Sequence, residues 1–309
     1  MDRHVLWSRA SRWPGVLIVA LSLVLWVAGL MARWSPTGQG TATAAVAADP
    51  VITAAGDIAP PGIRHQQQTS DRVLAIDPTL ALALGDEQYP AGSLADFRAF
   101  YSPTWGRFKA KTRPAPGNHE YLTAGAAGYF AYFGTAARPH GASYYSFDLG
   151  SWHLIALDSN ISRAAGSAQE RWLRRDLAVT SKRCLLAFWH HPRFSSGTHH
   201  GNNPSVAPFW NDLYAAQADL VLNGHEHNYE RFARQAPNGR ASAQGIREFV
   251  VGTGGNGHYR FGPPKPNSQA RNDTTFGVLK LTLHPTSYSW QFVADTGRVL
   301  DAGGPDTCQ

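Results

Sequence analysis

From residue 49 onward, short apolar runs alternate with segments in which apolar residues recur at helical spacing. This alternation predicts a sheet whose strands are joined by helical crossovers. The first helix is expected to begin at Ser70, a residue type that favours helix N-termini. The predicted strands cover residues 51–56, 79–85, 143–149, 151–158, 184–189, 219–222, 247–251, 277–284 and 288–293, and the predicted helices cover 70–76, 93–101, 167–177 and 207–216. No repeat or linker interrupts the pattern, so we predict one α/β domain over residues 49–309.

A different pattern occupies the N-terminus, where residues 15–32 are apolar apart from Ser22 and follow Arg3, Arg9 and Arg12. A basic segment followed by an apolar segment of this length is typical of a signal peptide or a signal anchor. We therefore expect residues 1–48 to engage the membrane or the export machinery. The domain would then be exported, and either secreted or anchored to the outer face of the membrane, depending on cleavage.

The composition of the 309-residue chain excludes several classes of protein. With 43% hydrophobic and 16% charged residues, it is not intrinsically disordered. The net charge of +6 falls to +3 without residues 1–48, and the basic residues form no run, so we expect no nucleic-acid surface. Two cysteines, Cys184 and Cys308, are too few for a cysteine-based metal module. In an oxidising compartment they could form a disulfide, and two unpaired thiols are the alternative.

Five polar clusters follow predicted strands or a rigid proline segment, at residues 56–59, 85–89, 117–120, 189–192 and 224–227. In α/β sheets, ligands bind where the carboxyl ends of the strands meet. Together the clusters supply seven or more oxygen and nitrogen donors. That set is too large for one tetrahedral metal ion and suits two adjacent ions.

The clusters read, in chain order, Gly-Asp, Gly-Asp, Gly-Asn-His-Glu, a lone His, and Gly-His-Glu-His. In this order they resemble the motifs of the calcineurin-like metallophosphoesterases. Two details resemble the purple acid phosphatases among them: Ala59 stands where the wider superfamily has a histidine, and Tyr89 stands three residues after Asp86. The resemblance implies a four-layer α/β/β/α sandwich with a single catalytic domain. It also implies an exported phosphomonoesterase with two metal ions, acting on a small-molecule phosphate ester.

The same resemblance implies a ligand set in which Asp86 bridges the two ions. The ligands expected for Fe(III) are Asp57, Tyr89 and His227, and those expected for a divalent Fe, Zn or Mn ion are Asn118, His190 and His225. A phenolate is a hard donor that favours Fe(III). A ferric ion lowers the pKa of bound water strongly, so activity at acid pH is expected.

Other polar residues near the motifs receive supporting or catalytic roles from the resemblance. His119 is expected to bind the phosphoryl group or protonate the leaving group while a metal-bound hydroxide attacks phosphorus in line. His200 is expected to contact the substrate, with a solvated loop as the alternative. We expect Glu120, His191 and His199 to support the ligands without binding metal.

Two alternatives to a phosphomonoesterase remain open at this point. The same metals would serve a phosphodiesterase, including one for cyclic nucleotides, and a non-catalytic cell-surface phosphate-binding protein is the remote alternative. The glycine-rich segment 252–257 lacks the ending of a phosphate-binding loop and is interpreted as a tight crossing near the site. The sequence gives no indication of the oligomeric state.

Overall fold

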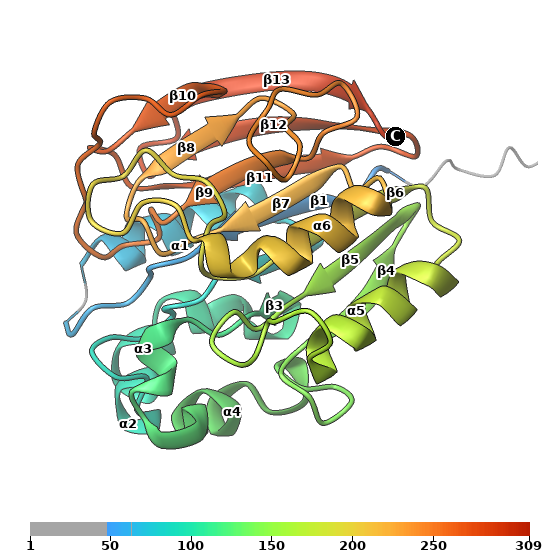
Figure 1. The fold of residues 1–309 in the computed structure, drawn as a ribbon. Coiled ribbons are helices and arrows are strands. Elements are labelled where there is room, and N and C mark those ends of the chain that lie inside the picture. The colour runs from blue at the N-terminus through green and yellow to red at the C-terminus, as the bar shows by residue number, and fades with distance from the viewer. Residues whose placement is uncertain (1–47, 63) are drawn as a thin grey trace, which may run out of the picture. The chain divides into compact units, whose positions relative to one another are not determined.

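The computed structural model describes residues 48–62 and 64–309, and it contains two β-sheets with flanking helices (Figure 1). The first sheet has the strand order β13-β12-β11-β1-β2-β3. Its strands β1, β2 and β3 are parallel, whereas β11, β12 and β13 continue the sheet in antiparallel pairs. The bounds are Val51–Ala55 (β1), Leu80–Ala83 (β2), Thr112–Pro114 (β3), Gly277–Leu283 (β11), Ser287–Ala294 (β12) and Val299–Thr307 (β13).

The second sheet has the order β10-β8-β9-β7-β6-β5-β4. Strands β5, β6, β7 and β9 are parallel, and antiparallel strands flank them on both sides. The bounds are Tyr145–Leu149 (β4), Trp152–Ala156 (β5), Cys184–Phe188 (β6), Leu220–Asn223 (β7), Tyr229–Phe232 (β8), Arg247–Val251 (β9) and Ser268–Asn272 (β10). Parallel strands thus form one half of the first sheet and the middle of the second, and parallel neighbours need crossover connections.

Helices cover the outer faces of the two sheets. Helix α1 packs on β11 and β12, while α5 and α6 lie over β5, β6 and β7 in Figure 1. The short helices α2, α3 and α4 follow β2 and β3. The bounds are His65–Ile76 (α1), Leu94–Asp96 (α2), Asn118–Tyr121 (α3), Ala127–Phe133 (α4), Ala168–Val179 (α5) and Ala207–Ala215 (α6). The predicted four-layer α/β/β/α sandwich is confirmed.

Strand β6 shows why the layers form. All its residues are buried, and successive side chains point to opposite faces of the sheet. Leu186 and Phe188 belong to the core between the two sheets, whereas Leu185 and Ala187 pack with helices α5 and α6. A continuous apolar run in the sequence therefore fills two cores at once, as expected of a central parallel strand.

Helix α1 begins at His65, five residues before the predicted start. Ser70 is buried inside the helix, and its hydroxyl donates to the carbonyl of Gln67. Some polar side chains in the first turns of α1 are buried because residues distant in the sequence form hydrogen bonds with them. Thr69 donates to the Gly254 carbonyl at 2.5 Å and accepts from the Trp105 indole at 3.0 Å. Residues 65–69 were missed because these residues are polar and show no apolar periodicity.

Strands β3, β8, β10 and β13 were also missed by the sequence pattern. Strand β13 contains Gly303, Gly304 and Pro305, which have low strand propensity, but it pairs with β12 along the sheet edge. Strand β10 is a polar edge strand, and β3 and β8 are only three and four residues long. Short strands and edge strands form through backbone hydrogen bonds with their neighbours. The alternation of apolar residues in the sequence does not reveal this pairing.

Cys184 and Cys308 form a disulfide, so the alternative of two unpaired thiols is wrong. The bond joins the first residue of β6 to the segment that follows β13, and therefore links the two sheets. Gln309 strengthens this link, since its backbone N–H donates to Asp219 at 2.9 Å.

The predicted localisation is corrected. Within residues 48–62 and 64–309, no helix is both long enough and apolar enough to cross a membrane. The apolar stretch at residues 15–32, from which export and anchoring were predicted, lies outside the described residues. The prediction rested on that stretch and the basic residues before it, and no feature of the described residues supports it.

His153 on β5 lies between two carboxylates. Its Nδ1 is 2.7 Å from Asp148 on β4, and its Nε2 is 2.9 Å from Asp176 on α5. Burial would lower the pKa of His153, but the hydrogen bonds to Asp176 and Asp148 outweigh burial and raise it. His153 therefore connects the hairpin of β4 and β5 to helix α5 through these two carboxylates.

The His153→Gln variant should lose stability in a pH-dependent manner. Near pH 5.5 we expect the free energy of unfolding to fall by about 1.5 to 3 kcal/mol, the range for hydrogen bonds to charged groups. Because the folded pKa is raised, the stabilisation is complete below the unfolded pKa and is lost as the pH rises through the folded pKa. Urea unfolding near pH 5.5 and pH 9 measures this difference, with the exposed His140→Gln as the neutral control. A difference of equal size at both pH values would contradict the charged interaction.

Candidate metal centre

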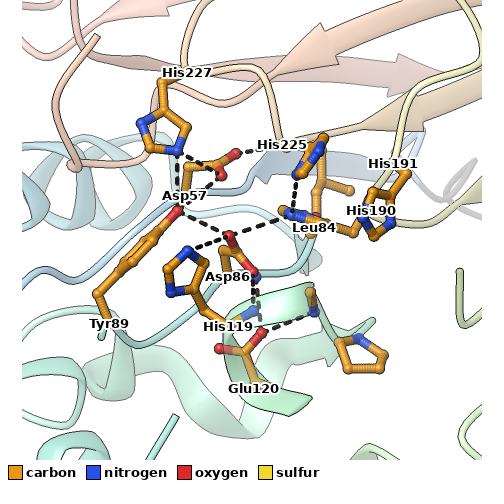
Figure 2. Close-up of polar contacts among 12 residues, drawn as sticks. Asp57, Leu84, Asp86, Tyr89, His119, Glu120, His190, His191, His225 and His227 are labelled. Atoms are coloured by element: carbon orange, nitrogen blue, oxygen red, sulfur yellow. Dashed lines mark hydrogen bonds and ion pairs between the residues drawn. The ribbon is translucent and has the colours of Figure 1, made fainter. Parts of the chain in front are cut away.

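The polar clusters predicted from the sequence lie at the carboxyl ends of parallel strands from both sheets. Asp57 follows β1, and Asp86 and Tyr89 follow β2, all in the first sheet. His190 follows β6, and His225 follows β7, in the second sheet. Figure 2 shows these side chains converging.

One group of donors forms around the hydroxyl of Tyr89. This oxygen lies 3.0 Å from Asp57 Oδ1, 3.0 Å from Asp86 Oδ2 and 3.1 Å from His227 Nε2 (Figure 2). His227 Nε2 is also 3.2 Å from Asp57 Oδ1. The opposite ring nitrogen of His227 contacts the Gly257 carbonyl at 2.6 Å, which directs Nε2 into the group. The three predicted Fe(III) ligands therefore meet.

A second group forms around His190, which is fully buried. Its Nε2 lies 3.3 Å from Asp86 Oδ2 and 3.1 Å from His225 Nδ1. Its Nδ1 contacts the Leu84 carbonyl at 2.9 Å, so Nε2 faces the site. One ligand atom from each of Asp86, His190 and His225 fits within 4.8 Å of the others. Asp86 belongs to both groups.

Asn118 and His119 approach Asp86 from the start of helix α3. The backbone N–H of His119 donates to Asp86 Oδ1 at 2.9 Å, which places Asn118 beside the carboxylate. The side-chain oxygen of Asn118 is buried and has no hydrogen-bond partner among the described residues. His119 Nδ1 contacts the Pro90 carbonyl at 2.6 Å, and its Nε2 lies 3.9 Å from Asp86 Oδ2.

The backbone at three predicted ligands has a left-handed conformation. The φ angles are 59° at Asp57, 50° at Asp86 and 73° at His225. Asp and His are among the few residue types that adopt this region with any frequency. Positive φ angles of this kind concentrate at functional sites, where the surrounding structure holds them.

Glu120 organises the loop that carries Asp86. Its carboxylate accepts backbone N–H groups from Asp86 at 2.9 Å, Gly117 at 2.8 Å and Gln88 at 3.1 Å. Gly117 lies so close to Asp86 that an added Cβ would overlap its carboxylate. Burial and the charge of Asp86 raise the pKa of Glu120 to about 7. Glu120 thus binds the backbone of the loop that carries Asp86, as its expected supporting role requires.

The titration of the central residues reflects their mutual contacts. Burial alone would raise the pKa of Asp86, but His190 and His119 outweigh burial and hold it below its usual range. In return, Asp86 overcomes the effect of burial on His190 and raises its pKa to about 9. Burial and the charges of Asp57 and Asp86 raise the pKa of the Tyr89 phenol well above its usual value.

His191, which follows the predicted ligand His190 and is expected only to support it, lies at the edge of the group. Its Nδ1 contacts the Ser159 hydroxyl at 2.7 Å, and its ring centre is 4.3 Å from that of His225. Burial and the charge of His190 lower the pKa of His191 to about 3. Its bonding to Ser159 and the buried position of His190 favour His190 as the ligand.

His199 and His200 stand in a chain of aromatic ring contacts that ends on two predicted ligands. His200 stacks on His225 with ring centres 3.8 Å apart, and His199 lies 4.4 Å from His200. Tyr259 connects the other end, at 4.1 Å from His199 and stacked on His227 at 3.8 Å. Tyr259 was missed by the sequence reasoning, although it follows the glycine-rich segment only two residues later.

The glycine-rich segment itself crosses the site, as predicted. The N–H of Gly254 donates to the Gly56 carbonyl at 2.9 Å, and that of Asn256 donates to the Asp57 carbonyl at 2.9 Å. The Gly257 carbonyl lies 2.6 Å from Nδ1 of His227. The segment therefore links the loop after β1 to the loop after β7.

The donor chemistry fits metal ions. Asp57 and Asp86 are buried carboxylates, and no lysine or arginine in residues 48–62 and 64–309 forms an ion pair with either. Burying charge without a counter-charge is costly, so the two carboxylates require a cation in addition to the histidines. Oxygen donors from Asp, Tyr and Asn together with imidazole nitrogens suit iron, zinc or manganese.

Comparison with known families agrees with this geometry. The calcineurin-like phosphoesterase family model matches residues 50–229, more than half of the chain, and the chain belongs to this family. Residues 248–302 match a second model, the iron/zinc purple acid phosphatase-like protein C domain. The resemblance to the purple acid phosphatase type is confirmed, and this type implies a dinuclear metal centre.

Curated relatives point to the same type. Purple acid phosphatase 21 of Arabidopsis thaliana is 30% identical over 242 residues, which cover 70% of this chain and 53% of the relative. Purple acid phosphatase 15 of the same plant is 30% identical, covering 61% of this chain and 42% of the relative. The chain spans about half the length of such relatives. An uncharacterized protein of Mycobacterium tuberculosis is 33% identical over 143 residues, which cover 38% of this chain and 27% of that protein.

Solved structures share the fold. A purple acid phosphatase from yellow lupin seeds superposes with a TM-score of 0.72 at 19% identity, covering 82% of this chain and 53% of that chain. GAP50 of Plasmodium, described as the anchor in the inner membrane complex, has a TM-score of 0.66 at 14% identity, covering 85% of this chain and 90% of that chain. Since the second is described as an anchor, the fold alone does not define an activity.

The close approach of Gly85 to His190 provides a test of the metal centre. Gly85 has φ +87°, and a Cβ there would lie 2.5 Å from His190 Nδ1. Gly85→Ala should displace the ring and weaken metal binding by about 10-fold or more, the cost of disturbing a ligand's orientation. Gly141 has nearly the same φ, +86°, but no neighbour within 4 Å, so Gly141→Ala is the matched control. Zinc titration followed by calorimetry measures both, and equal zinc affinity in the two variants would contradict the arrangement.

Proposed function

We propose that the chain is a phosphomonoesterase of the purple acid phosphatase type that uses two metal ions. The observation that carries the proposal is that Asp86 belongs to two donor groups at once, one around Tyr89 and one around His190. A carboxylate shared in this way is what a bridge between two adjacent ions requires. Family membership and the purple acid phosphatase relatives support the same reaction class.

The proposed ligands divide between two ions. Asp57, Tyr89 and His227 would hold Fe(III), and Asn118, His190 and His225 would hold a divalent iron, zinc or manganese ion, with Asp86 between them. When bound, the two ions would act as Lewis acids toward a phosphate ester and would activate water. The unpaired, buried Asn118 oxygen supports its place in the set, because a buried amide oxygen without a partner is costly unless something binds it.

Tyr89 favours a trivalent ion at the first position. Its phenol lies between two carboxylates, which keep its proton bound when no metal is present. Only a strongly acidic cation releases that proton efficiently, and Fe(III) is a stronger Lewis acid than a divalent ion. We therefore propose iron at the Tyr89 position and an acid pH optimum.

His119 is the proposed proton donor or phosphoryl contact. Its Nδ1 faces the Pro90 carbonyl, which fixes the ring and leaves Nε2 directed toward Asp86. Its side chain is 31% exposed, so Nε2 is accessible to a substrate bound at the centre. His200 is the proposed contact for the distal part of the substrate, since it covers His225 from an exposed loop.

Replacing Asp86 tests the shared carboxylate. Asp86→Ala should lower kcat/KM for p-nitrophenyl phosphate by more than about 100-fold, the upper range for residues that only orient metal ligands. The control is Asp77→Ala, because Asp77 has the same left-handed backbone, with φ 49°, and is exposed on the surface. Comparing the two variants removes the effect of placing alanine at positive φ.

Three outcomes would change the proposal. Hydrolysis that survives Asp86→Ala would contradict the two-metal reaction. Faster hydrolysis of bis-p-nitrophenyl phosphate than of the monoester by the wild-type protein would favour the phosphodiesterase alternative. A wild-type protein that binds two metal ions but cleaves neither ester would favour the phosphate-binding alternative.

Replacing Tyr89 tests the identity of the metal. The iron-loaded protein should show a visible charge-transfer band from a ferric phenolate, and Tyr89→Phe should abolish it. Tyr259→Phe is the control, because Tyr259 stacks on His227 but is not a proposed ligand. Absorption spectra and metal analysis measure the result. A colourless, fully active wild-type protein containing only zinc or manganese would contradict the iron assignment without affecting the proposed hydrolysis.

A further inference from the structure

The loop that carries His199 and His200 is bound by three buried glutamates. The loop runs from Arg193 to Gly201, directly after the proposed ligand His190. Several of its backbone N–H groups donate to the carboxylates of three glutamates. One of these residues follows strand β7, and the other two lie on strands β8 and β9. These carboxylates belong to Glu226, Glu230 and Glu248, and all three residues have no exposed surface.

Glu248 and Glu230 hold the first part of the loop. Glu248 on β9 accepts the N–H of Arg193 at 2.8 Å and that of Phe194 at 3.2 Å. Glu230 on β8 accepts the N–H of Ser196 at 2.7 Å. Hydrogen bonds from backbone N–H groups to a buried carboxylate are among the stronger ones in proteins. The first part of the loop is therefore fixed to the sheet at Arg193, Phe194 and Ser196.

Glu226 holds the end of the loop that reaches the metal centre. One oxygen of its carboxylate accepts the N–H of His200 at 2.6 Å and also that of Gly201. Glu226 lies between His225 and His227 in the chain. The same residue therefore contacts the loop and separates two proposed metal ligands.

Gly197 makes this contact sterically feasible. A Cβ at Gly197 would overlap the Glu226 carboxylate. On its other side, the loop pairs with the segment of Tyr259, since Thr198 N–H donates to the Arg260 carbonyl at 3.1 Å. The Glu226 contact thus fixes His200 over His225 and, through this pairing, the ring chain that includes Tyr259.

We propose that Glu226 is a positioning residue that holds His200 against the substrate side of the metal centre. This inference rests on the proposed function for its effect on hydrolysis. The structural part is independent of it, because the hydrogen bonds to the His200 and Gly201 backbone can be measured in an inactive protein.

Hydrogen exchange tests the structural part with the full chain loaded with zinc. Glu226→Ala should accelerate exchange of the 197–203 peptide by about 10-fold or more, as expected when strong hydrogen bonds are lost. Glu226→Gln keeps an acceptor oxygen and should retain most of the protection. If Glu226→Ala fails to fold, Gly197→Ala serves instead, since its Cβ should displace the carboxylate. Unchanged exchange in Glu226→Ala, or in Gly197→Ala where that replaces it, would overturn the inference.

Kinetics test whether Glu226 acts through His200. Glu226→Ala should lower kcat/KM for p-nitrophenyl phosphate by about 10-fold to 100-fold with two metal ions still bound, whereas Glu226→Gln should stay near wild type. In a His200→Ala background, the Glu226→Ala effect should shrink to less than about 2-fold, because residues acting as one unit are not additive. Full additivity would show that Glu226 acts on another part of the site and would overturn the proposal. A wild-type protein without hydrolysis would instead contradict the proposed function, and the exchange result would still stand.

Discussion

Two buried carboxylates, Asp57 and Asp86, impose the main constraint on this structure. They lie where strands of both sheets end, and within the described residues they form ion pairs with histidines alone. Their neighbours are arranged to hold them in place. Glu120 and Gly117 fix the loop of Asp86, while the N–H of His225 donates to Asp57 at 2.8 Å. A site in which buried charge is retained at such structural cost is a site prepared for cations.

The two-sheet architecture explains how one centre gathers donors from distant parts of the chain. Each sheet contributes the carboxyl ends of its parallel strands, so neither sheet alone holds a complete set. The first supplies the aspartates and Tyr89, and the second supplies His190, His225 and His227. Because each donor group combines residues from both sheets, the packing of the sheets sets the distances within each group. Strand β6, buried on both faces, packs against the outer helices as well as the central core.

The order of motifs in the sequence was sufficient to predict the fold and to select the residues that converge. The position of the motifs after apolar strands predicted that their donors converge, and the resemblance to the purple acid phosphatases named Asp57, Asp86, Tyr89, His190 and His227 among them. Long-range partners were beyond the same reasoning. Helix α1 begins early because Gly254 and Trp105 satisfy Thr69, and Tyr259 joins the site by stacking on a ring 32 positions earlier. Interactions of this kind depend on tertiary packing, which local periodicity does not encode.

The left-handed backbone at Asp57, Asp86 and His225 has an evolutionary consequence. At these positions a side chain must satisfy two independent conditions, metal affinity and tolerance of positive φ. Glutamate matches aspartate in charge, but only short polar residues and histidine are enriched in this backbone region. Neutral drift at the three positions is therefore narrower than ligand chemistry alone would permit.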